Sequence, residues 1–266
     1  MKRVEPEVFL IARPAVDYDE MSRYLKAVSG QAWLSRSEDG DREPVGSRAT
    51  ADLLEFAGRL CYRSWEPGLN PNVRRVRANQ DDYLRNLLKQ AHGSVLEHAN
   101  FTFVLHNVSR VLTHELVRHR AGTAVSQESM RFVRLTELPF PFPEWAEGDE
   151  ELMARSAEFL EESERFQQWL SEHFDLDSDD RDFGYRKHRT SFMRRFAPDG
   201  VATGLVWTAN VRAIRHVLEA RTAPGAEEEI RLVFDKVGRV MRAEAPALFG
   251  DFEVRDGAWV PGWSKV

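Results

Sequence analysis

The stretch NFTFVLHNVSRVLTHELVRHR, residues 100–120, carries the first strong indication of the fold. Apolar residues alternate over 100–106, which is typical of a strand with one buried face. From 108 to 119 the apolar residues return at helical spacing, and Asn107 or Ser109 can cap the first turn. A strand followed directly by a helix indicates a mixed fold, with the basic triplet Arg-His-Arg at the helix end.

Outward from this stretch, the same periodicity predicts the remaining elements. We expect, in chain order, a strand over 8–12, a helix over 49–60 capped by Thr50, an amphipathic helix over 81–93 ending in Gly93, a ligand-binding loop over 121–132, an exposed acidic helix over 151–175, and long helices over 201–221 and 227–246. This order indicates the α/β class in its α+β form, with a mixed or antiparallel sheet and long helices. Residues 1–266 contain no internal repeat and no separating linker, so a single domain is expected.

The overall composition is that of a globular protein. The chain of 266 residues is 42% hydrophobic and has a formal net charge of −6. That charge argues against a surface dedicated to nucleic acid, because such binding depends on clustered positive charge. No apolar run approaches the roughly 20 residues that cross a bilayer, and no signal peptide is evident, so we expect a cytoplasmic protein without a membrane partner. Cys61 is the only cysteine, which excludes an internal disulfide and indicates a small core residue.

Arginines nevertheless gather locally, at 73–77, 118–134, 186–195 and 212–221. Arginine offers a planar fork of donors, so these clusters indicate small anionic ligands. The sequence contains none of the common metal-binding or nucleotide-binding motifs. HELVR at 114–118 lacks the second His of a zinc-protease site, and the chain has neither GxGxxG nor GxxxxGK[ST]. We therefore expect no metal site, and a nucleotide would have to be held in another way.

Three stretches combine Arg or His with small hydrogen-bonding residues: HGSVLEH (92–98), RHRAGTAVSQESMR (118–131) and WTANVRAIRHVLEAR (207–221). Each also has a purely structural interpretation. The triplet at 118–120 can complement a helix dipole. Arg212 and His216, four residues apart, can form a solvated helix face. Taken singly, the stretches leave both interpretations open.

Together, the three stretches resemble the flavin-dependent thymidylate synthases. The signature of that family is Arg-His-Arg, seven residues and Ser, followed closely by Arg; here eight residues precede Ser129, and Arg131 follows. The family's upstream element, a His with Ser or Thr two residues later and then Glu-His, matches 92–98. Its downstream element, Trp-Thr-x-Asn-x-Arg ending in Arg, matches 207–221. All three occur in family order, and the resemblance spans about residues 50–250.

The resemblance implies a homotetramer with active sites at subunit interfaces. It implies that FAD and deoxyuridylate bind, that NADPH reduces the flavin, and that methylenetetrahydrofolate supplies the carbon that becomes the methyl group at C5 of the uracil. The residues implied to contact FAD are Ser94, Arg118, His119, Arg120, Gln127, Asn210, Arg212 and His216. Those implied to line the nucleotide are Glu115, Arg118, Gln127, Ser129, Met130, Arg131, Arg194 and Arg221. Arg221 is implied to be catalytic by facing the uracil, and no acid lies three or four positions upstream to pair with it.

The chain departs from the family where the nucleotide is expected. The signature loop carries one extra residue, and Glu115 replaces the usual Gln. A carboxylate there would repel a phosphate unless it is paired. One alternative is therefore a C5-methylase of another uridine nucleotide, such as UMP, within the same family. A second alternative, from another class, is an RNA-binding module that uses the basic runs at 73–77 and 185–195.

Overall fold

The computed structural model describes residues 2–33, 47–131 and 137–264. Its elements, in chain order, are β1 (Lys2–Val4), β2 (Glu7–Ala12), α1 (Tyr18–Ala27), α3 (Ser47–Leu60), α4 (Gln80–Lys89), α5 (Gly93–Leu96), β3 (Asn100–Ser109), α6 (Arg110–Leu116), β4 (Thr123–Gln127), β5 (Pro139–Pro141), α7 (Glu144–Glu147), α8 (Glu150–His173), α9 (Phe183–Met193), the 3₁₀ helix η1 (Arg194–Phe196), β6 (Ala202–Asn210), α10 (Val211–Arg221), α11 (Glu228–Glu244), α12 (Pro246–Phe249), β7 (Phe252–Arg255) and β8 (Ala258–Pro261). This order confirms the predicted α+β class. Within the described ranges, no helix is long and apolar enough to span a membrane.

The central sheet has the strand order β2-β3-β6-β4, and every pairing in it is antiparallel. On β3, the alternating residues Phe101, Phe103 and Leu105 are fully buried. Trp207 of β6 packs beside Phe103, with ring centroids 5.9 Å apart. The half-buried strand predicted over 100–106 is therefore confirmed, and it continues to Ser109.

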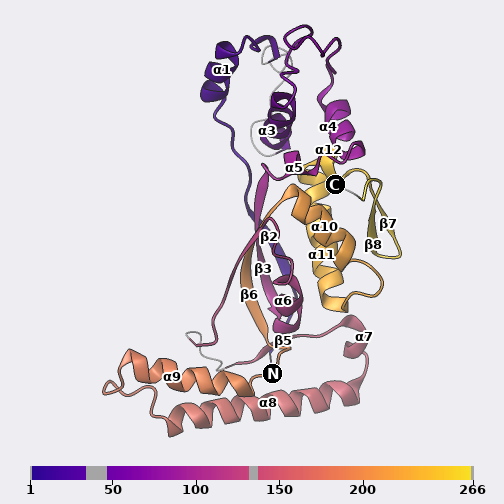
Figure 1. The fold of residues 1–266 in the computed structure, drawn as a ribbon. Helices are drawn as coiled ribbons and strands as arrows, with labels where there is room; N and C mark the ends of the chain where they lie inside the picture. The colour runs from indigo at the N-terminus through magenta and orange to yellow at the C-terminus, as the bar shows by residue number, and fades with distance from the viewer. Residues whose placement is uncertain (1, 34–46, 132–136, 265–266) are drawn as a thin grey trace.

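Helices α10 and α11 cover one face of this sheet (Figure 1). The predicted stripe of α10, formed by Val211, Ile214 and Leu218, is fully buried. Phe234 of α11 meets Trp207 edge to face, with ring centroids 5.4 Å apart. Each such side chain contributes about 1.5–3 kcal/mol by leaving water, which fixes the helices on the sheet.

The two ends of the sheet carry separate groups of helices. Helices α1, α3 and α4 gather at one end, while α8 and α9 lie across the other (Figure 1). The acidic helix predicted over 151–175 is confirmed as α8, which buries Leu160, Gln167 and Leu170. Near α8, β1 pairs in parallel with β5.

Two predicted elements are wrong. Residues 123–127 of the supposed loop over 121–132 form β4, paired with β6 from Thr123↔Ala209 to Gln127↔Leu205; Phe132 lies outside the described residues. The helix predicted over 201–221 is helical only from Val211, because Ala202–Asn210 is strand β6. In β6, Leu205, Trp207 and Ala209 are buried, whereas Val206 on the other face is 37% exposed. Because Val206 is also apolar, the sequence does not alternate and also satisfies a helical period.

Smaller corrections concern caps and Cys61. Thr50 does not cap α3, because the helix begins at Ser47 and Thr50 is buried within it. Helix α4 ends at Lys89, and Ala91 takes the left-handed conformation (φ 55°) that terminates a helix. Gly93 instead begins α5. Cys61 is exposed rather than a core residue.

Candidate active site

The cap of α6 positions the Arg-His-Arg triplet. The side chain of Ser109, rather than Asn107, accepts a hydrogen bond from the amide of Leu112 at 3.1 Å. Glu229 of α11 accepts from the Ser109 amide at 2.7 Å and from its hydroxyl, which ties the cap to the helical layer. The helix then ends just before residues 118–120, as predicted.

Gly122 turns the chain from the triplet into β4. Its φ is +69°, and a Cβ there would lie 2.3 Å from Nδ2 of Asn210. Glycine is required because an L side chain is strained in this conformation and has no space. The amide of Asn210 donates to the Gly122 carbonyl at 3.0 Å, and Oδ1 of Asn210 caps α10 by accepting from Ala213 at 2.8 Å. Asn210 thus joins the second motif to the third.

Arg221, the last residue of α10, lies against the triplet. Its Nε donates to Nε2 of His119 at 2.7 Å, and its Nη1 pairs with Oε2 of Glu115 at 2.5 Å. Its Nη2 donates to the Glu115 carbonyl at 3.2 Å. The acidic partner of Arg221 does not lie on the same helix but on α6, 106 positions away, so helical spacing does not predict this pair. The Glu115 carboxylate is therefore already paired, which removes the objection that it would repel a phosphate.

His119 is held in its neutral form. Burial, followed by the nearby charge of Arg221, lowers the pKa of His119 to about 4. Because Nε2 accepts from Arg221, the ring proton belongs on Nδ1. The His216 ring stands edge-on, with centroids 5.4 Å apart. At neutral pH, His119 is a hydrogen-bond acceptor that orients Arg221.

A cavity of about 360 Å³ opens beside these residues and is lined by Arg118, His119, Arg120, Ala121, Ala213, His216 and Val217. Arg212 and His216 are both exposed, which confirms that they share a face of α10. Arg212 pairs with Glu97, next to α5, at 2.6 Å. Ser94 is exposed on α5. The structure thus brings residues of all three motifs to one end of the sheet.

The other predicted nucleotide residues lie at or beyond the far end of β4. Gln127 is fixed through Nε2 to the Thr113 hydroxyl at 3.1 Å. Ser129 Oγ accepts from the amide of Arg131 at 3.3 Å, Met130 is half-buried, and Arg194 is exposed at the start of η1. A five-residue strand spans roughly 16 Å. The predicted site is therefore divided into two groups within one chain.

Two residues near this second group were not predicted. Arg110 donates through Nη2 to the carbonyl of Glu128 at 3.1 Å, directly before Ser129. Its pKa is lowered, chiefly by burial. Thr113 holds Gln127 as described above. The only sequence signal was the spacing of Arg110 and Thr113, three apart on one helix, which would place them on a common face.

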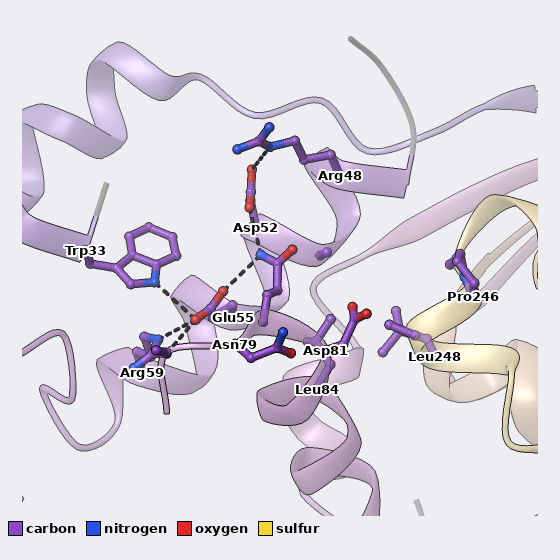
Figure 2. A pocket seen from close by; sticks show the side chains of 15 residues that line it. Trp33, Arg48, Asp52, Glu55, Arg59, Asn79, Asp81, Leu84, Pro246 and Leu248 are labelled. Carbon is purple, nitrogen blue, oxygen red and sulfur yellow. Dashed lines mark hydrogen bonds and ion pairs between the residues drawn. The ribbon is translucent and has the colours of Figure 1, made fainter. Parts of the chain in front are cut away.

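Another cavity, of about 450 Å³, lies between α3, α4 and α12 (Figure 2). Both carboxylate oxygens of Asp52 are engaged, by Tyr18 and Gln80 at 2.8 Å each. Those of Glu55 accept from Arg59 at 2.7 Å and from Gln80 at 2.9 Å. Carboxylates satisfied in this way stabilise the fold. Among the residues that the structure describes, no cluster of three His, Cys, Asp or Glu is arranged to hold a metal ion.

Comparison with known proteins agrees with this geometry. Residues 47–247 match the family described as "Thymidylate synthase complementing protein" (Thy1). The flavin-dependent thymidylate synthase of Mycobacteroides abscessus is 37% identical over 220 residues, which cover 82% of this chain and 83% of that protein. The enzyme of the same name from Mycobacterium tuberculosis is 35% identical over 204 residues, covering 76% and 79%. A UMP/dUMP methylase, PolB from Streptomyces cacaoi, solved with 5-Br dUMP, has the same fold, with a TM-score of 0.59 over 94% of this chain and 96% of that chain at 18% identity.

Proposed function

Because this chain belongs to the flavin-dependent thymidylate synthase family, we propose that it converts deoxyuridylate to thymidylate. Methylenetetrahydrofolate supplies the carbon and NADPH the reducing electrons, with FAD as the cofactor. The observation that carries the proposal is the contact of Arg221 with His119, which unites the second and third motifs of the family beside an arginine-lined cavity. The RNA-binding alternative explains neither this contact nor the family match.

The cavity at His119 fits a flavin nucleotide in its donors. Arg118 and Arg120 offer forked cations for a pyrophosphate, and Arg212 and Ser94 extend the donor set toward α5. Bound FAD carries the electrons of NADPH to the one-carbon unit. A cavity of about 360 Å³ lies near the lower end of the range for ligand sites, so this chain alone encloses only part of so large a cofactor.

Arg221 is the residue we assign to the uracil. A guanidinium has five N–H donors, and the three contacts to Glu115 and His119 use three of them. The remaining two can meet the carbonyl edge of a pyrimidine, where they would stabilise negative charge as C5 becomes nucleophilic. Glu115 and His119 then act as positioning residues that fix the plane of the fork.

Ser129, Arg131 and Arg194 are assigned to the nucleotide phosphate, with Gln127 and Met130 beside them. The length of β4, roughly 16 Å, separates them from Arg221 and its partners. This separation supports an active site completed by a second chain, as in the expected homotetramer. The sheet face opposite α10 and α11 supports the same assembly, because Phe9 and Ile11 are 46% and 56% exposed on it.

The remaining features follow from the same proposal. The family match ends at residue 247, yet β8 packs on α10 and α11 and pairs with β7. We therefore regard residues 1–266 as one catalytic domain. A reaction that consumes NADPH and a reduced folate belongs in the cytoplasm, where both are supplied.

The test begins with the visible spectrum of the purified protein. A flavin band, and NADPH-dependent methylation of deoxyuridylate at C5, are expected. Parallel assays with UMP address the alternative substrate. A protein that stays colourless after FAD is added would exclude the proposal, whereas a yellow protein that turns over only UMP would identify it as a methylase of the ribonucleotide.

A further inference from the structure

A basic hollow of about 400 Å³ lies on α4, and its lining includes Arg77, Asn79, Asp82, Arg85, Lys89 and Trp263. We call it the α4 hollow. It shares no lining residue with the cavity at His119. Asp82, Arg85 and Lys89 stand three and four residues apart on α4, so they present one face of that helix.

The charge of the α4 hollow opposes that of the whole chain. Its lining contains the cations Arg77, Arg85 and Lys89 against the single acid Asp82, whereas the chain carries −6. Arg85 and Lys89 are exposed, and neither forms an ion pair with an acid within the described part of the chain. Unpaired cations around a concave surface raise the local concentration of anions.

A buried ion pair holds the Trp263 wall of the hollow. Arg215 and Asp251 are 3% and 7% exposed and meet at 2.6 Å. The same guanidinium donates to the Trp263 carbonyl at 3.2 Å, and Asp251 accepts from the Trp263 amide at 3.4 Å. The backbone that carries the indole is therefore fixed.

A second buried ion pair holds the opposite wall. Arg59, which is 1% exposed, pairs with Glu55 at 2.6 Å and donates to the Arg77 carbonyl at 2.6 Å; Figure 2 shows the Glu55–Arg59 pair. The Arg77 side chain is fixed in turn by Asn86 at 3.0 Å. Support of this kind preorganises binding residues and reduces the entropy lost when a ligand binds.

From these features we propose that the α4 hollow is a second nucleotide site, which binds a nucleoside phosphate. The indole of Trp263 stacks on the base, as aromatic rings do with every nucleobase. Arg85 and Lys89, assisted by Arg77, hold the phosphate. Asp82 accepts from a ribose hydroxyl. A volume of about 400 Å³ suits one mononucleotide, and the site gives a role to Arg77 of the basic run at 73–77.

AMP is the probe, because its purine distinguishes it from the uridine nucleotide of the proposed reaction. AMP is titrated calorimetrically into protein that has been incubated with saturating FAD and dUMP. We expect one AMP per chain. Binding should weaken at least tenfold in Arg85→Glu/Lys89→Glu and in Trp263→Ala, and Trp263→Phe should retain it. The matched control Lys26→Glu/Lys187→Glu makes the same charge change at two exposed lysines outside the hollow and should bind as the parent does.

Melting temperatures of all variants establish that each is folded. The α4 hollow is not a nucleotide site if the parent shows no AMP binding at millimolar concentration. The same conclusion holds if Arg85→Glu/Lys89→Glu binds AMP as tightly as the control does. A uridine oligonucleotide that binds through these residues while AMP does not would replace the proposal with an RNA-docking surface. None of these outcomes depends on methylation, so failure here is distinguishable from failure of the proposed enzyme function.

Discussion

Replacing Arg221 by alanine should damage catalysis and stability for separate reasons. The substitution removes three hydrogen bonds, to Nε2 of His119 and to the carboxylate and carbonyl of Glu115. It also leaves the Glu115 carboxylate, 30% exposed as a side chain, without its partner. If Arg221 faces the uracil, the same substitution removes the fork that stabilises charge on the ring.

The two effects have different sizes. Losing one charge-assisted hydrogen bond costs about 1.5–3 kcal/mol of unfolding free energy. In a chain of this length that lowers the melting temperature by roughly 3–12 °C. Losing one preorganised donor lowers methyl transfer by roughly 10²–10³. Reduction of bound flavin by NADPH should proceed at the parental rate, because it precedes the methyl transfer that Arg221 assists.

Three companion variants separate the effects. Arg221→Lys restores a cation for Glu115 and should recover most of the stability, but lysine cannot present a two-pronged donor, so the rate stays low. Glu115→Gln/Arg221→Ala removes the unpaired charge and should melt above Arg221→Ala without regaining the rate. Glu115→Gln alone measures how much the ion pair between Glu115 and Arg221 contributes to stability. The assays are thermal melting, flavin reduction followed by absorbance, and single-turnover methyl transfer at saturating nucleotide.

Two results would refute this reasoning. Methyl transfer at the parental rate in Arg221→Ala would reduce Arg221 to a helix-end cation that serves only to pair with Glu115. Recovery of the rate together with the melting temperature in Glu115→Gln/Arg221→Ala would show that the original loss was structural. Either outcome would move the catalytic role to another residue.

Three further predictions address the other assigned residues. Arg118→Ala and Arg212→Ala should each release FAD, at about 1.5–3 kcal/mol per charged hydrogen bond lost; full flavin absorbance after gel filtration in both would contradict the assigned contacts. Ser129→Ala should raise KM for the nucleotide roughly tenfold while largely sparing kcat, since no adjacent base makes Ser129 a nucleophile, and a covalent adduct on Ser129 would overturn this. His119 should make the fold acid-sensitive, because its imidazole protonates near pH 6.5 in the unfolded chain but only near pH 4 in the folded one. Stability is therefore lost as the pH falls from 6.5 to 4, and His119→Gln should flatten the slope of melting temperature against pH in that window.

The sequence predicted elements well where burial is one-sided. Phe101, Phe103 and Leu105 alternate because one face of β3 meets the helices, and the stripe on α10 follows from the same cause. β6 could not be recognised in this way, although its burial alternates, because Val206 on the less buried face is itself apolar and interrupts the alternation in the sequence. The end of α4 was misplaced because Ala91 occupies a backbone conformation usually taken by glycine.

The extra residue of the signature loop illustrates a second limit. Sequence comparison shows only that the spacing before Ser129 is longer by one residue. In the structure, β4 pairs with β6 in unbroken register, and the Glu128 amide continues the ladder to the Gly204 carbonyl at 3.0 Å. A residue inserted within the strand would reverse the facing of every later side chain. The additional residue is therefore accommodated before the paired segment, at the turn formed by Ala121 and Gly122.

The pairing of Glu115 with Arg221 lay beyond sequence reasoning for a different reason. Helical spacing relates residues three or four apart, whereas these two are 106 positions apart and meet only because β3 and β6 are neighbours in the sheet. Each strand leads directly into a helix, β3 into α6 and β6 into α10, so pairing the strands brings the helices side by side. Glu115, which replaces the usual Gln of the family, pairs its carboxylate with Arg221 instead of leaving it free to repel the nucleotide phosphate. An orienting partner of opposite charge holds the planar guanidinium in place before the substrate arrives, which is the condition for preorganised electrostatic catalysis.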